Sequence, residues 1–408
     1  MVEWIDVLLS DILMDKGYIR GPFGSALKRG DMKEDGIPVY EQQHAIYNSR
    51  DFRYYIDEQK FNEMKRFQVK KDDLIISCSG TVGKVSIIKD DDPKGIISQA
   101  LLLLRADTNK VLPLYLKYFF SSREGYSAIV SRSSGSVQVN IAKRSVIEQI
   151  PLKLPQIKTQ RKIVGVLSSI DKKIKENERI NNNLEQQYIS LVDNLLSKLT
   201  QYKIYSLLEV ADCQNGRAFY KEGYDPNGAF VIDLGNVNTS GNFVRTAADK
   251  YISLDRYKEP KLEKYRVYKN DIVMVMTDRK STMELLGKVG KIYKDGYYLL
   301  NQRMYRIRAK EGINTNYLYA CLNSTETSNF LKRKALGSVQ KYVNTGEINS
   351  IEIKVPSSEK MEEIASILDP IFLQMESNIL ENESLNELRD ILLPKLMSGE
   401  LDVSGIDL

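Results

Sequence analysis

The second half of this 408-residue chain repeats the first half at an offset of about 200 residues. Five short segments recur in the same order, and the sequence Gly-Ser-Val-Gln is identical in both halves. The paired segments are 69–77 with 267–275, 83–85 with 287–289, 98–106 with 301–309, 135–138 with 337–340, and 152–155 with 353–356. Repetition at a fixed period indicates structurally alike units. The chain is therefore expected to contain two copies of one fold.

Each repeat begins with a mixed pattern of strands and helix. Short apolar runs bounded by Gly, Asp and Asn are typical of strands, and a helical period follows them. The predicted strands are 74–77, 85–88, 100–104, 272–276 and 297–300, and the predicted helices are 114–120 and 316–322. We expect one globular α+β domain over residues 1–155 and a second over residues 201–356.

A different pattern follows Pro155 and Pro356, where apolar residues recur with a four-three spacing typical of a coiled coil. It predicts one long helix within residues 156–200 and another within 357–408, which includes the C-terminal tail. Pro370 and Pro394 fall inside the second helix and are expected to kink or shorten it. The seam residues are Ile163, Leu167, Ile170, Ile174, Asn177, Asn181, Leu184 and Leu191, then Ile364, Leu368, Ile371, Met375, Asn378, Asn382, Leu385 and Leu392.

Two asparagines occupy matching seam positions in each helix. Antiparallel pairing places Asn177 near Asn382 and Asn181 near Asn378, and parallel pairing matches them as well, so the asparagines alone do not give the direction. Two amphipathic helices packed separately on their own domains are the alternative. An antiparallel pair of about 34-residue helices spans about 50 Å and holds one domain at each end. The two domains would then be related by an approximate twofold axis.

Charge is distributed unevenly along the chain, whose net charge is +5. Residues 1–155, 156–200, 201–356 and 357–408 carry +3, +3, +8 and −9. A polyanion such as DNA is attracted to the two predicted domains and repelled by the last segment. The opposite charges of the two predicted helices favour their pairing.

Composition excludes several kinds of chemistry. The single histidine, His44, rules out every mechanism that needs a histidine pair. Three distant cysteines make a disulfide framework or a cysteine zinc site unexpected and favour the cytoplasm. The run Gly80-Thr-Val-Gly-Lys-Val lacks the spacing of a phosphate loop, and the chain lacks the Asn/Asp-Pro-Pro-Tyr motif of an adenine methyltransferase. We expect no catalytic centre, metal or cofactor in this chain.

Taken together, these features resemble the specificity (S, HsdS) subunit of type I restriction–modification systems. The resemblance rests on residues 70–84, on both Gly-Ser-Val-Gln segments, on Gln160-Arg-Lys-Ile-Val, and on the terminal Leu392-Leu-Pro-Lys-Leu-Met-Ser-Gly-Glu-Leu, which is echoed at 195–199. It implies two tandem α/β target-recognition domains separated by two long helices that pair as an antiparallel coiled coil. The second repeat departs from the family pattern at 277–288, where an insertion replaces Ser-Gly-Thr-Val-Gly-Lys.

The resemblance also implies a non-catalytic subunit in which each domain reads one half of a split DNA site. Two methyltransferase (modification) subunits would bring S-adenosylmethionine, and two motor-nuclease (restriction) subunits would use ATP and Mg²⁺. A coiled-coil scaffold whose two domains bind protein or glycan is the alternative from another functional class.

Base reading requires Arg or Lys for guanine and Asn or Gln for adenine, carried on loops. We predict DNA contacts at Lys28, Arg29, Gln42, Gln43, His44, Ser79, Thr81, Lys84, Arg132, Ser133, Ser134, Ser136 and Gln138 in the first domain. The second-domain candidates are Arg217, Phe219, Tyr220, Asn236, Asn238, Asp278, Arg279, Lys280, Ser338, Gln340, Lys341 and Tyr342. Residues shared by both repeats are expected to support the fold or to contact the DNA backbone, because two half-sites differ in sequence.

Overall fold

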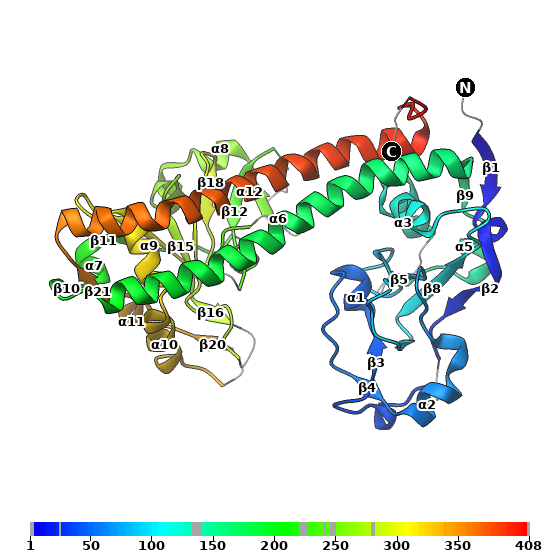
Figure 1. Ribbon diagram of the computed structural model, residues 1–408, viewed down its shortest axis with the longest axis horizontal. Helices are drawn as coiled ribbons and strands as arrows, with labels where there is room; N and C mark the ends of the chain where they lie inside the picture. Colours follow the sequence, from blue (N-terminus) through cyan, green and yellow to red (C-terminus); the bar gives the residue numbers. More distant parts are fainter. Residues whose placement is uncertain are drawn as a thin grey trace. The chain divides into compact units, whose positions relative to one another are not determined.

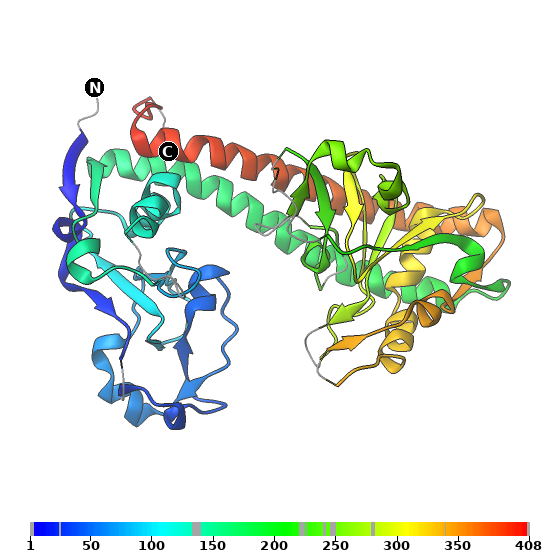
Figure 2. The same cartoon turned by 180° about the vertical axis from the view of Figure 1, so that it is seen from behind.

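The computed structural model describes residues 4–23, 26–132, 140–219, 225, 227–239, 242–244, 250–278, 282–338 and 340–405. The chain divides into two compact units, one formed by residues 1–173 and 384–408 and the other by residues 174–383. Both described chain ends lie in the first unit, where they approach the beginning of the helix α6 (Ile157–Ser197; Figures 1 and 2). Each unit contains one α+β domain together with part of each long helix.

The first unit is built around a four-stranded sheet in the order β2-β8-β5-β6, beside a three-stranded sheet in the order β4-β3-β7 and the antiparallel pair β1-β9. Its strands are β1 (Trp4–Leu8), β2 (Leu13–Arg20), β3 (Ile37–Tyr40), β4 (Tyr55–Ile56), β5 (Leu74–Ser77), β6 (Val85–Ile87), β7 (Ile96–Ile97), β8 (Leu101–Ala106) and β9 (Pro151–Pro155). Its helices before α6 are η1 (Leu9–Ile12), η3 (Arg29–Asp31), α1 (Gln42–Ile46), α2 (Glu58–Glu63), η4 (Lys65–Phe67), α3 (Pro113–Ser121), α4 (Arg123–Val130) and α5 (Arg144–Ile147).

The second unit repeats this plan with the sheets β11-β19-β15-β17 and β13-β12-β18-β14 and the pairs β10-β21 and β16-β20. Its strands are β10 (Lys203–Ser206), β11 (Ala211–Asn215), β12 (Ala229–Ile232), β13 (Lys250–Ile252), β14 (Arg266–Val267), β15 (Ile272–Val275), β16 (Thr277–Asp278), β17 (Val289–Lys291), β18 (Tyr298–Leu300), β19 (Met304–Ala309), β20 (Lys341–Tyr342) and β21 (Glu352–Val355). Its shorter helices are α7 (Leu207–Val210), η5 (Leu234–Asn236), α8 (Leu254–Tyr257), η6 (Pro260–Tyr265), α9 (Thr315–Asn323), α10 (Thr325–Arg333) and α11 (Thr345–Asn349).

The duplication read from the sequence is therefore present in the strand order as well. In both units a parallel pair, β3 with β7 and β12 with β18, lies in the second sheet. The predicted strands and helices fall on observed elements, within one or two residues at each end. The α+β interpretation is confirmed.

Two 41-residue helices follow the domains, α6 (Ile157–Ser197) and α12 (Ser358–Ser398). The expectation that proline shortens the second helix is wrong, because α12 continues through Pro370 and Pro394. Both prolines lie on the exposed side of the helix. Each removes one backbone hydrogen bond, while buried neighbours such as Phe372 and Leu396 hold the helix against the core.

The direction of helix pairing follows from the cores of the separate units. In the first unit Ile163 and Leu167 of α6 share one core with Leu393 and Leu396 near the end of α12. In the second unit, residues from the later part of α6 share a core with residues from the beginning of α12: Tyr188, Val192 and Leu196 with Met361, Ile364 and Leu368. The helices therefore pair antiparallel, and the alternative of two separately packed helices is excluded.

Candidate nucleic-acid interface

The Lys-x-Asp motif occurs in both repeats, at residues 71–73 and 269–271. In both units its aspartate is buried and forms an ion pair with an arginine. The carboxylate of Asp73 accepts the backbone N–H of Lys70 at 2.7 Å and two bonds from Arg105 at 2.8 and 2.7 Å. Asp73 is 1% exposed, and burial raises the pKa of its carboxyl despite the guanidinium beside it. Asp271 repeats the arrangement with Tyr268 and Arg308. This shared motif supports the fold and does not face a ligand.

Gln160, at the beginning of α6, is also a structural residue. Its side chain is buried and its Nε2 donates to the backbone oxygens of Pro155 and Lys110, at 2.9 and 3.1 Å. Its Oε1 accepts the N–H of Leu112 at 2.8 Å. These bonds fix the start of the helix to the first domain.

Two first-domain candidates, Gln42 and Ser79, lie together at the end of β5. Oε1 of Gln42 accepts the N–H of Ser79 at 2.9 Å, and Oγ of Ser79 bonds to Oδ1 of Asn140 at 2.9 Å. Ser79 and Asn140 also form an isolated β-bridge. The segment that follows the first Gly-Ser-Val-Gln is thus held beside the loop that follows β5.

The basic candidates of the first domain are more accessible. Lys28, Arg29 and Lys84 are exposed, and Arg132 is half-buried with its guanidinium donating to Ala128 O at 2.8 Å. Nζ of Lys84 lies 4.9 Å from the ring centroid of Tyr126. Thr81 is exposed and Gln43 is half-buried, with the amide of Gln43 donating to Asp51 O.

His44 is a core residue and is left out of the proposed contacts. It is fully buried and stacks on Phe52 with ring centroids 4.6 Å apart. Its Nδ1 accepts the N–H of Glu41 at 2.7 Å, so its Nε2 donates to Asp51 O at 3.1 Å. Burial lowers the pKa of the imidazole. The imidazole therefore stabilises the α1 turn, and its buried ring is not accessible to DNA.

Asn236, Asn238 and Asp278 in the second domain are likewise engaged in local structure. Oδ1 of the buried Asn236 accepts Asp233 N–H at 2.8 Å, and Oδ1 of Asn238 accepts Asn242 N–H at 2.8 Å. The buried Asp278 accepts Leu285 N–H at 2.7 Å. Hydrogen-bonding capacity spent inside the domain is not available for base edges.

The remaining second-domain candidates gather near β16 and β20. Thr277 pairs with Tyr342 and Asp278 with Lys341, which repeats the Ser79–Asn140 bridge of the first unit with longer strands. Gln340 and Lys341 are half-buried, Tyr342 is 40% exposed, and Ser338 is exposed. Arg217 forms an isolated β-bridge with Asn301, and the N–H of Phe219 donates to Oδ1 of Asn301 at 3.4 Å. The predicted contacts that lie outside the described residues are Ser133, Ser134, Ser136, Gln138, Tyr220, Arg279 and Lys280.

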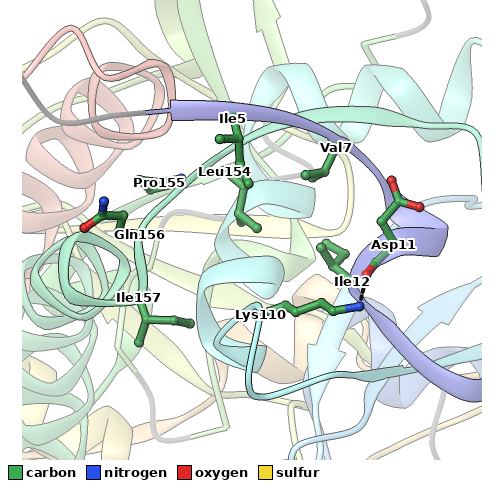
Figure 3. Close-up of a pocket in the computed structure, with 9 residues that line it drawn as sticks. All are labelled: Ile5, Val7, Asp11, Ile12, Lys110, Leu154, Pro155, Gln156 and Ile157. Carbon is green, nitrogen blue, oxygen red and sulfur yellow. Dashed lines mark hydrogen bonds between the residues drawn. The ribbon is translucent and has the colours of Figure 1, made fainter.

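A separate cavity of about 540 Å³ lies between the β1-β9 pair and the beginning of α6 (Figure 3). Its lining is mainly apolar, with Ile5, Leu154 and Ile157, and Nζ of Lys110 donates to Asp11 O at 2.8 Å. The predicted DNA-contact residues are absent from its described lining. Lys310 repeats the bond in the second unit by donating to Leu208 O at 2.6 Å. We assign this feature to the junction of domain and helix.

The seam asparagines face one another in the second unit. Nδ2 of Asn177 donates to Oδ1 of Asn382 at 2.9 Å, and Nδ2 of Asn378 donates to Oδ1 of Asn181 at 2.8 Å. The predicted seam residues are buried or half-buried and none is exposed. Opposed asparagines in a coiled coil select one register.

Neither a metal site nor a membrane span emerges from the part of the chain that the structure describes. Its His, Cys, Asp and Glu side chains form no group of three that could hold a metal ion. None of its helices combines the length and the apolar character needed to cross a membrane.

Comparison with known proteins adds the family. A family model described as the type I restriction modification DNA specificity domain matches residues 23–186 and again 200–389. The MjaVIII specificity subunit of a type I restriction enzyme from Methanocaldococcus jannaschii is 22% identical over 434 residues, covering 99% of this chain and 94% of that protein. The HindI specificity subunit from Haemophilus influenzae is 23% identical, covering 82% and 87%.

A solved structure shares the fold. The S subunit of a type I restriction–modification system from M. genitalium superposes with a TM-score of 0.53 at 15% identity, covering 97% of this chain and 96% of that one. The two matched domains, the duplicated sheets and the antiparallel helices agree with the resemblance read from the sequence, and they decide against the scaffold alternative. The chain belongs to the type I restriction–modification specificity subunits, the non-catalytic DNA-recognition subunits of these systems.

Proposed function

We propose that each α+β domain reads one half of a bipartite DNA target and that the helix pair sets the spacing between the halves. Residues 1–155 form the first target-recognition domain and 201–356 the second, with the helical segments 156–200 and 357–408 between and after them. The duplicated strand order, together with antiparallel packing of α6 against α12 inside each unit, is the observation that supports this proposal most strongly.

The accessible candidates in the two domains would supply the DNA contacts. Lysine and serine or threonine side chains suit phosphates, and half-buried amides and guanidiniums suit base edges. The contacts proposed from described residues are Lys28, Arg29, Gln42, Gln43, Ser79, Thr81, Lys84 and Arg132, then Arg217, Phe219, Ser338, Gln340, Lys341 and Tyr342.

The long helices would also dock two methyltransferase subunits. Several large apolar residues of α12 are exposed instead of packed, including Leu373 at 61%, Leu380 at 37% and Ile391 at 58%. Exposed apolar residues repeated along one helix are typical of a surface that another helix covers. We expect Leu373→Glu with Leu380→Glu to abolish co-purification of the methyltransferase subunit. The paired control, Leu373→Met with Leu380→Met, keeps the apolar surface and should retain it.

The partners would bring the chemistry. The modification subunits would bind S-adenosylmethionine, and two motor-nuclease subunits would use ATP and Mg²⁺ for cleavage. Recognition would take place in the cytoplasm, where the chromosome and these subunits are available. This chain would contribute target choice and geometry alone.

Exchange of one domain tests the proposal. Residues 201–356 are replaced by the corresponding domain of another specificity subunit, and the methylated motif is read from the genome of a host that expresses the complex. One half of the motif should change while the other half and the partners remain the same. A motif that changes in both halves would contradict the assignment of one domain to one half-site.

A further inference from the structure

A polar cleft opens beside β16 and β20 in the second domain, with a volume of about 630 Å³. The side chains that matter in it are Asn215, Thr277, Arg303, Gln340 and Tyr342. Gln340 and Tyr342 were singled out from the sequence, whereas Thr277 and Arg303 were not. The cleft therefore joins the second Gly-Ser-Val-Gln segment to residues that lie far from it in the chain.

Arg303 adopts a backbone conformation that is costly for its residue type. Its φ is 68°, in the left-handed region that arginine rarely occupies. Its backbone oxygen accepts the N–H of Met276 at 2.9 Å, which fixes the turn before β19. Strain of this kind is concentrated at functional sites, where it positions a side chain. The exposed guanidinium reaches the cleft and donates from Nη1 to Oε1 of Gln340 at 3.0 Å.

Two polar atoms in the cleft are buried without a hydrogen-bond partner in the described structure. They are Nε2 of Gln340 and Oγ1 of Thr277, and Thr277 is only 8% exposed. A buried polar atom without a partner is unfavourable and unusual in a native fold. A ligand that supplied hydrogen-bond acceptors would satisfy both atoms. Because Oε1 of Gln340 is already engaged by Arg303, the amide offers the ligand only its N–H donors.

The donors match one base edge in particular. A guanidinium and an amide N–H₂ both seek acceptors, and guanine presents two of them, O6 and N7, in the major groove. Adenine presents a donor beside its N7 and would oppose the guanidinium. Arginine paired with guanine is the commonest specific contact between proteins and DNA.

We propose that this cleft reads a guanine in the half-site of the second domain, with Arg303 contacting the base and Gln340 acting as the positioning residue. The inference rests on the proposed function and extends it to one base. Comparison of the repeats supports the division of roles. The residue that matches Arg303 in the first repeat is Ala100, whereas the glutamine occurs in both repeats. A residue that differs between the repeats suits the reading of two different half-sites.

The test uses the specificity chain assembled with its methyltransferase subunits, and it measures affinity for the cognate duplex and for duplexes altered one base pair at a time. Arg303→Gln should reduce discrimination for guanine at one position of the second half-site by about 10- to 100-fold. Discrimination across the first half-site should stay unchanged. Gln340→Leu should reduce discrimination at the same position, and Gln340→Glu should reduce it as well, because the carboxylate still accepts from the guanidinium but offers guanine no N–H donor.

The control is Arg256→Gln on α8, which lies apart from β16 and β20 in both views (Figures 1 and 2). This variant removes the same charge and should leave the base preferences intact. Arg303→Lys should also lose guanine discrimination, because lysine cannot form the two parallel hydrogen bonds of a guanidinium. An unchanged thermal unfolding midpoint of this variant would show that the loss does not come from a folding defect.

Three results would overturn the inference while the proposed function stands. One is a second half-site without guanine. Another is that Arg303→Gln weakens the affinity for all duplexes equally and reduces the slope of log affinity against log salt concentration by about one. That result would identify Arg303 as a phosphate contact. The third is unchanged discrimination in Arg303→Gln. Failure of the unmodified complex to prefer any split sequence would instead overturn the proposed function.

Discussion

Nδ2 of Asn378 on α12 donates a 2.8 Å hydrogen bond to Oδ1 of Asn181 on α6, and both side chains are buried. Nδ2 of Asn181 in turn donates to the backbone oxygen of Met375 at 3.1 Å. The bond therefore ties the helices at one register, since a shift by one turn would leave buried amides without partners. Register matters because the helix pair is proposed to set the distance between the two half-sites.

The companion pair predicts opposite effects for single and double substitution. Asn382→Leu alone should destabilise the chain by about 1–3 kcal/mol, because it leaves Nδ2 of the buried Asn177 without its bond to Asn382. The double variant, Asn177→Leu with Asn382→Leu, should be at least as stable as the unmodified chain, but its helices should be held less strictly in one register. Urea unfolding measures the stability, and disulfide trapping between introduced cysteines on α6 and α12 reports the register. A double variant less stable than the single one would show that the asparagines do not act as a facing pair.

A buried lysine predicts a rise in stability with pH. Lys291 is 8% exposed, donates to Oδ1 of Asn316 at 2.8 Å and lies over the ring of Phe372. Burial lowers the pKa of its ammonium from 10.5 to about 8. The folded chain therefore releases this proton before the unfolded chain does, and stability should increase between pH 8 and 10.5.

Lys291→Met removes this titration and serves as the comparison. The variant should be more stable than the unmodified chain at pH 7 by about 3 kcal/mol, and the difference should shrink toward pH 10. Urea unfolding of both proteins at several pH values measures it. A constant difference between the two proteins across this range would contradict the assignment.

The loops before the candidate contacts depend on two glycines that match between the repeats. A Cβ on Gly21 would lie 1.9 Å from Ser98 O, and a Cβ on Gly216 would lie 1.7 Å from Asn301 O. Gly21→Ala and Gly216→Ala should each cost about 1–3 kcal/mol through forced separation of the backbones. The controls are Gly30→Ala and Gly235→Ala, where a Cβ meets nothing within 4 Å. Equal stability of all four variants would show that this close approach is not required.

Salt dependence separates backbone contacts from base contacts. The affinity of the assembled complex should fall by at least about 10³-fold between 50 and 200 mM salt, as expected for several phosphate contacts. Lys84→Gln should weaken all DNA sequences alike and reduce the salt slope by about one, because the exposed ammonium of Lys84 has no carboxylate within salt-bridge distance in the described structure. Lys153→Gln on β9 is the matched control. A slope unchanged by Lys84→Gln would remove Lys84 from the interface.

Much of the fold was readable from the sequence because its signals are periodic or repeated. The four-three spacing predicted α6 and α12, and opposed asparagines followed from antiparallel pairing. The direction itself was not readable, because Asn177 and Asn181 match Asn378 and Asn382 in either orientation. Contacts of Leu167 with the end of α12 settle the direction.

The candidate site was less readable because exposure depends on long-range packing. His44 and Asn236 have suitable chemistry for bases, yet both are enclosed by residues from other elements. Arg303 was missed because its signal is a backbone conformation together with a difference from Ala100 in the other repeat. A single sequence draws attention to motifs that both repeats share as candidate functional residues. The shared Lys-x-Asp motif is instead structural, because its aspartate pairs with an arginine inside each domain.

Sequencing of methylated motifs after exchange of residues 1–155 tests the central claim most directly. The exchanged chain, expressed with its unchanged methyltransferase, should methylate a split motif in which one half is new and the other half and the spacer length are retained. A motif altered in both halves, or a changed spacer length with both halves retained, would contradict the account.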